Sequence, residues 1–238
     1  MSSQVVEALI YWFPVFLFST TVHEAAHAWV ALRGGDPTAY LGGQVSLNPL
    51  PHIRRSPVGM LVVPLITSAT QGWTMGWAAA PYDPVWAHHY PRRAAWMAAA
   101  GPAGNLLLAL IAFGLIRAGL AFGVLQAPAS VSFGYLADAA PGIASPGFWH
   151  VVAKLLSVGL VLNSLLFTFN LLPLPPLDGS VVITLPLPDA AARQFRALTS
   201  SGPASLIGIL VAWKVFPYLA GPLFRLVVGA LYPGQYDL

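Results

Sequence analysis

Two histidines and a glutamate near the N-terminus have the types and the spacing of a zinc site. His23, Glu24 and His27 form an H-E-x-x-H pattern inside an apolar stretch. On a helix, residues four apart project from one face, so both imidazoles could hold one zinc ion while Glu24 contacts the reacting water. Ionisable groups are costly inside hydrocarbon, which argues against a chance pattern. The expected chemistry is hydrolysis by an activated water molecule.

A catalytic zinc site needs a third protein ligand and leaves one position open. Asp178 is the one carboxylate besides Glu24 that lies in an apolar environment, directly after the proline-rich stretch 173–176. Prolines end a helix, and broken backbone at membrane depth is tolerated only where it lines a cavity or is buried in protein. We therefore favour Asp178 as the third ligand. The alternative is that Asp178 caps the following helix.

Asn105 lies in a small-residue segment, 98–105, that would let two helices approach closely. Gly101 and Asn105 are four residues apart and share one face of a helix, so Asn105 would point into that contact. Its amide could donate a hydrogen bond to the oxyanion that forms during hydrolysis. An inter-helix hydrogen bond explains Asn105 nearly as well.

The composition indicates a membrane protein. Apolar residues make up 57% of the 238-residue chain and charged residues only 8%, against roughly 25% charged residues in an average soluble domain. A soluble globular enzyme is therefore excluded. The formal net charge of +3 is too dilute for a nucleic-acid interface, and the lack of cysteine excludes disulfides and thiolate ligands.

Apolar windows of spanning length predict an all-α polytopic membrane protein with about four to six transmembrane helices. The segment 58–70 is shorter and contains Pro64; we favour a re-entrant segment, and the alternative is a short tilted helix that crosses the membrane. The chain is interpreted as one domain, 1–238, with a motif-bearing core over 8–187 and an additional C-terminal helix over 203–231. The other spanning windows lie at about 8–32, 94–123 and 150–172.

Strand periodicity occurs over 41–49, where the apolar residues Val45 and Leu47 alternate with polar residues up to Asn48. Glycine and proline bound this stretch, which is typical of a short strand. We expect a membrane-associated β-strand or hairpin here, whose edge receives an unwound substrate segment by strand addition. His52 follows the strand and could also contact the substrate.

The arginines favour one side of the membrane. If 58–70 re-enters, all seven arginines of the connecting segments fall on one side, whereas the N-terminus and the 124–149 loop carry no lysine or arginine. The positive-inside rule then predicts a cell-membrane protein with both termini outside and the 34–93 and 188–202 connections in the cytoplasm. These arginines are Arg33, Arg54, Arg55, Arg92, Arg93, Arg193 and Arg196.

Three motifs, in this order, together resemble the site-2 protease family of intramembrane zinc metalloproteases. They are H-E-x-x-H at 23–27, G-P-x-x-N at 101–105 and N-x-x-P-x-x-x-x-D-G at 170–179. The stretch 43–52 is also similar to a strand region of that family. The resemblance covers roughly 20–182 and is to the minimal branch, which lacks PDZ and CBS domains.

The resemblance implies the role of each motif residue. His23, His27 and Asp178 would hold a single Zn²⁺ ion per chain, and Glu24 would be the general base. Help in binding the substrate or the oxyanion would come from two asparagines, Asn105 and Asn170. The implied partners are the lipid bilayer and a transmembrane protein substrate, such as an anti-sigma factor or a signal-peptide remnant.

Two other function classes stay open at this point. One is a membrane metal or ion transporter, since intramembrane histidine and aspartate also mark ion pathways. The other is a catalytically silent scaffold of the same fold. Glu24 distinguishes them from a protease, because its replacement by glutamine should abolish peptide hydrolysis and leave the metal bound.

Overall fold

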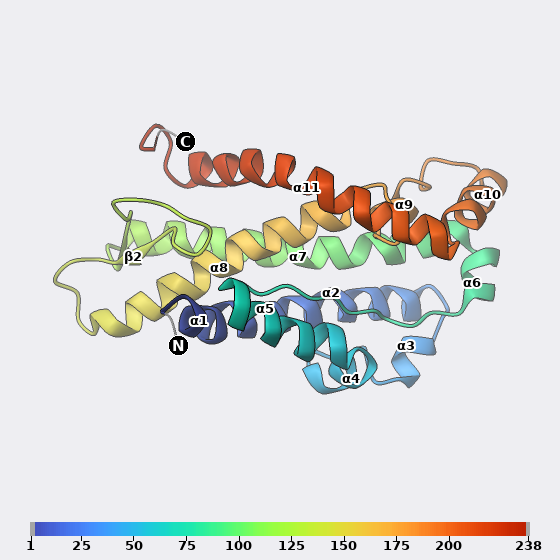
Figure 1. Cartoon of the computed structure of the whole chain (residues 1–238), viewed down its shortest axis with the longest axis horizontal. Coiled ribbons are helices and arrows are strands. Elements are labelled where there is room, and N and C mark those ends of the chain that lie inside the picture. Colours follow the sequence, from blue (N-terminus) through green and yellow to red (C-terminus); the bar gives the residue numbers. More distant parts are fainter. Residues whose placement is uncertain (1–2, 237–238) are drawn as a thin grey trace.

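The computed structural model describes residues 3–236, and most of them are helical (Figure 1). Within the described chain, four helical stretches are long and apolar enough to span a membrane, which confirms the predicted all-α polytopic membrane fold. The first stretch, Ser3–Arg33, consists of α1 (Ser3–Glu7), the π-helical turn η1 (Ala8–Trp12) and α2 (Phe13–Arg33). The others are α7 (Pro91–Ala121), α8 (Pro146–Asn170) and α11 (Gly202–Leu231).

Helix α7 packs against both α2 and α8 and is the centre of the bundle. Its buried positions recur every three or four residues and carry mostly small side chains, among them Ala98, Gly101 and Ala109. Small residues let helix backbones approach closely within a membrane. The two motif-bearing helices α2 and α7 are therefore in direct contact.

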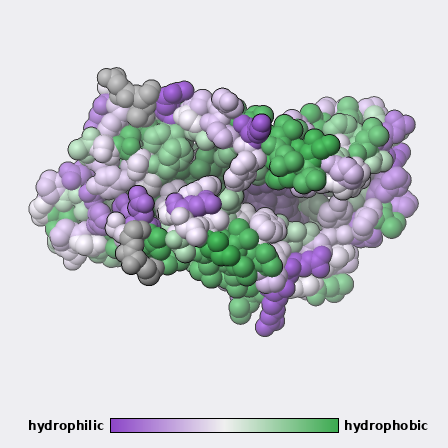
Figure 2. All heavy atoms as spheres, viewed as in Figure 1, coloured by the Kyte–Doolittle hydropathy of each residue, from purple (hydrophilic) through white to green (hydrophobic). Residues whose placement is uncertain are grey.

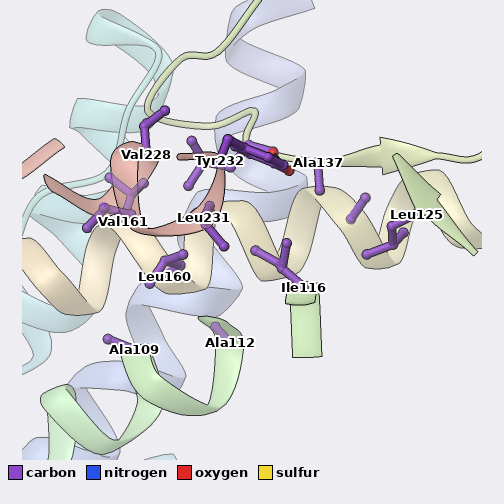
Figure 3. Packing of buried hydrophobic residues seen from close by; sticks show 13 residues of the cluster. Ala109, Ala112, Ile116, Leu125, Ala137, Leu160, Val161, Val228, Leu231 and Tyr232 are labelled. Atoms are coloured by element: carbon purple, nitrogen blue, oxygen red, sulfur yellow. Dashed lines mark hydrogen bonds between the residues drawn. The ribbon is translucent and has the colours of Figure 1, made fainter. Parts of the chain in front are cut away.

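A cluster of buried apolar residues joins α7, α8 and the end of α11 (Figure 3). Ile116 and Leu231 are fully buried in it, and Leu160 is 3% exposed. Beside this cluster, the two-residue strands β1 (Leu125–Gln126) and β2 (Asp138–Ala139) pair in antiparallel orientation. The cluster and the strands close the end of the bundle at which the described chain begins and ends (Figure 1).

Short helices lie at the opposite end of the bundle (Figure 1). They are α3 (Thr38–Leu41), α6 (Pro84–His89), α9 (Gly179–Val182) and α10 (Asp189–Thr199). Arg33, Arg92 and Arg93 lie at the helix ends that meet here, and α10 carries Arg193 and Arg196. Five of the seven arginines of the connecting segments thus lie at this end, whereas Arg54 and Arg55 lie on α4 (Pro49–Arg55).

The chain reverses direction after η2 (Val58–Val62) and α5 (Val63–Gln71), at exposed residues that lie beside the start of the first helical stretch. Gly72 makes the reversal in the left-handed conformation, with φ 73°, which glycine adopts without strain. The chain then returns along an extended path over 73–83 toward α6 (Figure 1). We call this segment the returning chain. The backbone N–H of Trp77 donates to the carbonyl oxygen of Gly59 at 3.0 Å and ties the returning chain to η2.

The strand predicted over 41–49 is wrong. Residues 45–47 form bends, and Asn48 instead caps α4 (Pro49–Arg55) by accepting a hydrogen bond from the Leu50 N–H at 3.0 Å. Two local effects explain this outcome. Pro49 and Pro51 lack the N–H that a ladder needs, and short polar side chains compete for nearby backbone groups.

Candidate metal centre

Three ligand atoms from two distant parts of the chain converge at one point. His23 and His27 lie on α2, and Asp178 lies just before α9. The two Nε2 atoms are 3.0 Å apart, and the Asp178 Oδ2 atom is 3.1 Å from Nε2 of His23 and 3.4 Å from Nε2 of His27. All three residues are largely shielded from solvent, so this is a buried group of two imidazoles and one carboxylate that can hold a metal ion.

The outer nitrogens of both rings are engaged by groups that accept hydrogen bonds. Nδ1 of His23 donates to the side-chain oxygen of Asn105 at 2.6 Å, and Nδ1 of His27 donates to the backbone carbonyl of Met97 at 2.7 Å. In the neutral rings, the lone pairs are therefore on the Nε2 atoms, which face each other and the carboxylate. Such an electron-rich pocket fits a divalent cation, and partners on Nδ1 are typical of metal-binding histidines.

Helix α7 leaves room for the ion by having a glycine at the point of contact. A Cβ atom added at Gly101 would lie 2.3 Å from Nε2 of His27 and 2.5 Å from Nε2 of His23. Zinc–nitrogen bonds are about 2.0–2.1 Å long. The space that a side chain at Gly101 would fill is thus the space next to both ligand nitrogens, which suits a bound ion.

Glu24 is buried beside this group, with 4% of its surface exposed. Its Oε2 atom has no hydrogen-bond partner among the described residues. An unpaired buried polar atom costs free energy, roughly 1–3 kcal/mol. Glu24 is therefore a carboxylate whose hydrogen-bond partner is to be supplied by a ligand or by water.

Asp178 occupies the N-cap position of α9, as its alternative interpretation requires, but its side chain makes no capping hydrogen bond there. Its carboxylate is instead directed at the two histidines. Helix α8 ends at Asn170, ahead of the prolines, and the turns that follow carry Asp178 back to the bundle. The geometry favours the ligand role.

The contacts of Asn105 favour a positioning role over the oxyanion role. Its side-chain oxygen accepts from His23, and its NH₂ group donates to Oδ1 of Asn163 at 2.9 Å and to the Ser19 carbonyl at 3.4 Å. Asn105 is fully buried, so no hydrogen-bonding group of its side chain remains for a substrate. Its function in this arrangement is to hold the ring of His23.

Sequence reasoning missed the support behind Asn105. Asn163 on α8 donates to the Ser19 hydroxyl at 2.9 Å, which closes a buried polar network between α2, α7 and α8. A signal was available, because an asparagine and a serine inside apolar spans are expensive unless they have partners. That signal identifies such residues as important but does not identify their partners.

Five residues predicted to bind substrate are not among the ligands of the metal centre and make other contacts or lie on the surface. Asn170 donates to the carbonyl of Leu166 at the end of α8. His52 is fully buried and bonds the carbonyl of Ser46, so it has no exposed surface with which to contact a substrate. Val45 is half-buried, and Leu47 is 62% exposed in the bends before α4. Asn48 is engaged in the helix cap described above.

A buried carboxylate outside the spans anchors the returning chain to α2. Asp36 follows α2 and accepts hydrogen bonds from the backbone N–H groups of Thr38 and Asp83 at 2.9 and 2.8 Å. Burial raises the pKa of Asp36, but the hydrogen bonds from Thr38 and Asp83 outweigh it and lower the pKa below its ordinary value. The ionised carboxylate fixes the point at which the returning chain meets the end of α2.

Comparison with known proteins identifies relatives that match most of the chain. The family model of peptidase family M50 matches residues 11–213. The chain is 35% identical to a Bacillus subtilis protein named "Putative zinc metalloprotease YwhC", over 78% of this chain and 73% of the relative. No solved structure matches the chain.

Two mycobacterial proteins named "Putative zinc metalloprotease Rip2" are also similar. Identity to the Mycolicibacterium smegmatis protein is 33%, over 89% of this chain and 69% of the relative. Identity to the Mycobacterium tuberculosis protein is 28%, over the same shares of the two chains. The family-model match over 11–213 includes all three residues of the metal centre.

Proposed function

We propose which residues carry out the reaction of this chain, which belongs to peptidase family M50 and is an intramembrane zinc metalloprotease. His23, His27 and Asp178 hold the zinc ion, and Glu24 is the general base. One observation supports this assignment. Two Nε2 lone pairs and one carboxylate oxygen converge beside the space that a side chain at Gly101 would fill.

Glu24 moves the protons of the reaction. It accepts a proton from the water that attacks the scissile carbonyl, and it delivers that proton to the amine that leaves when the C–N bond breaks. A zinc ion held by the three ligands supplies a Lewis acid that activates water and polarises the carbonyl. Asn105 and the Met97 carbonyl keep the histidine rings in position throughout.

Zinc content tests the ligand assignment. We expect detergent-purified wild-type protein to contain about one zinc ion per chain and the Asp178→Ala variant to contain little, because three protein ligands are the usual number in a catalytic zinc site. Metal analysis by mass spectrometry measures this directly. Equal zinc in both proteins would show that Asp178 is not a ligand and would overturn the proposed centre.

The substrate is a transmembrane segment that unwinds before it is cut, because a helix hides its carbonyls in its own hydrogen bonds. We assign the edge that pairs with the unwound substrate to the returning chain, because the 41–49 segment forms no strand. Gly76 lies against Phe16 of α2, and the Asp83 N–H bonds Asp36 just past the end of α2. The returning chain therefore runs along α2 and passes the level of His23. Figure 2 shows the face hollowed between α11 and this chain.

Alternation along the returning chain indicates which backbone groups face a substrate. The N–H groups of Met75 and Trp77 point toward α5 and η2, where they bond the Thr67 hydroxyl and the Gly59 carbonyl. In extended chain, alternate residues point to opposite sides. The N–H groups of Ala78 and Ala80 then point away from α5 and η2 and are the ones that pair with the substrate backbone.

Proline at these positions tests strand addition. Ala80→Pro removes an outward N–H and should lower cleavage of a single-span substrate roughly three- to tenfold, the value of a typical hydrogen bond. The matched control is Ala79→Pro, whose N–H points to the other side and whose activity should change little. Zinc content should be unchanged in both. Equal losses in the two variants would contradict pairing along this edge.

The arginine-rich end is the cytoplasmic one, and both termini are outside the cell membrane, in keeping with the positive-inside rule. Because the chain has no cysteine, single cysteines introduced in α10 and in the 124–149 loop can report orientation. A membrane-impermeant thiol reagent added to intact cells should label the loop cysteine and leave the α10 cysteine unlabelled. The reverse pattern would invert this topology.

Suitable natural substrates are single-span proteins such as an anti-sigma factor or a signal-peptide remnant.

A further inference from the structure

A cleft with a basic lining lies at the arginine-rich end, away from the metal centre. It has a volume of about 190 Å³ and lies between α6, the chain just before it, and α10. Two arginines, one histidine and two hydroxyl groups line it, on Arg193, Arg196, His88, Tyr82 and Ser200. No acidic residue lines the cleft in the described part of the chain.

The two arginines differ in what holds them. Arg196 donates one hydrogen bond to the backbone carbonyl of Ala87 at 3.0 Å, which fixes its position across the cleft from α10 to α6. Arg193 is half-buried and has no hydrogen bond or ion pair among the described residues. A guanidinium has five N–H donors, so most of those in the cleft are available to a ligand.

Two aspartates near the cleft offset only part of this charge. The Asp83 carboxylate, which accepts from the N–H of Val85 at the start of α6, offsets at most one of the two arginines. Asp189 on α10 pairs with Arg92 at 3.5 Å on the surface. The cleft therefore keeps a net positive charge in a partly desolvated place, which favours an anion with several oxygen atoms.

The position of the cleft indicates a lipid. Helix α10 directly precedes the apolar span α11, so it lies at the membrane surface. Both short helices also carry exposed apolar side chains outside the cleft lining, with Leu198 76% exposed and Val85 63% exposed. We propose that the cleft binds the phosphate of an anionic phospholipid headgroup.

Such a ligand would join two parts of the catalytic machinery. Helix α6 leads into α7, which carries Gly101 and Asn105, and α10 follows the segment that carries Asp178. A phosphate held between Arg193 on α10 and the end of α6 would draw these two parts together. Binding would thus couple the composition of the membrane to the arrangement of the metal centre.

Native mass spectrometry of the detergent-purified, zinc-loaded protein tests the proposal. The probe is dioctanoyl phosphatidylglycerol, compared with dioctanoylglycerol, which lacks the phosphate, and with inorganic phosphate. We expect phosphatidylglycerol to bind, and Arg193→Gln to raise its Kd about tenfold, the loss expected for one charge-assisted hydrogen bond. Arg193→Gln is chosen because Arg196 also has a structural contact.

The matched control is Arg54→Gln, which removes an equal charge at the end of α4 outside the cleft and should change the Kd by less than a factor of two. Equal zinc content in all three proteins shows that the variants are folded. A Kd unchanged by Arg193→Gln, or raised as much by Arg54→Gln, would overturn the site. Displacement of the lipid by inorganic phosphate at equal concentration would overturn the lipid and indicate a soluble phosphate ligand.

Discussion

Replacing Gly101 by alanine should remove zinc from the protein and abolish proteolysis. The added Cβ would lie 2.3 and 2.5 Å from the two ligand nitrogens, which is as close as a zinc ion itself would lie. Neither ring can withdraw, because each is held by a hydrogen bond on its far side. We expect zinc content to fall from about one ion per chain to a small fraction, measured by metal analysis of the purified variant.

The matched control for this variant lies one turn further along the same helix. A Cβ at Gly104 would be 3.5 Å from the Val22 side chain and 3.6 Å from that of Ala26, which are ordinary contacts. Gly104→Ala should therefore keep its zinc and its activity. If Gly101→Ala bound zinc as well as Gly104→Ala does, the metal would have to lie elsewhere.

Replacing Glu24 by glutamine should stop peptide hydrolysis and leave zinc bound. The change keeps the size of the side chain and removes its ability to accept and return a proton. General acid–base groups typically contribute a factor of about 10²–10⁴ in rate. We expect a loss of this size in the cleavage of a single-span substrate reconstituted with the enzyme, followed by gel electrophoresis.

Zinc content is the readout that separates this effect from a damaged site. Glu24→Gln should match the wild type, whereas Asp178→Ala should not. A Glu24→Gln variant with most of its activity would remove the general base from the mechanism.

Much of the fold was predictable because the membrane imposes a strong and local rule. About 20 apolar residues are needed to cross, and all four long windows found in the sequence are helices long and apolar enough to span a membrane. The proposed metal ligands could also be identified from the sequence, for a related reason. An ionisable side chain in hydrocarbon is so costly that each one invites a functional explanation, which singled out His23, His27 and Asp178.

The errors concern features that depend on distant partners. The alternation at Val45 and Leu47 is a local pattern, and it was overridden by the helix cap at Asn48 and the neighbouring prolines. The extended chain that runs beside α2 comes from 73–83, a stretch with no strand periodicity. Asn105 was recognised as important, yet its bonds to His23 and Asn163 come from α2 and α8, which no spacing along α7 can indicate.

The division of the metal centre between the first span and the turns after the third has a consequence for biosynthesis. The two histidines are synthesised early, with α2, whereas Asp178 is synthesised only after α7 and α8. A nascent chain thus carries an incomplete set of ligands until most of the protein has been inserted. On the proposed assignment, proteolytic capacity would therefore arise only after the third of the four long helices has been made.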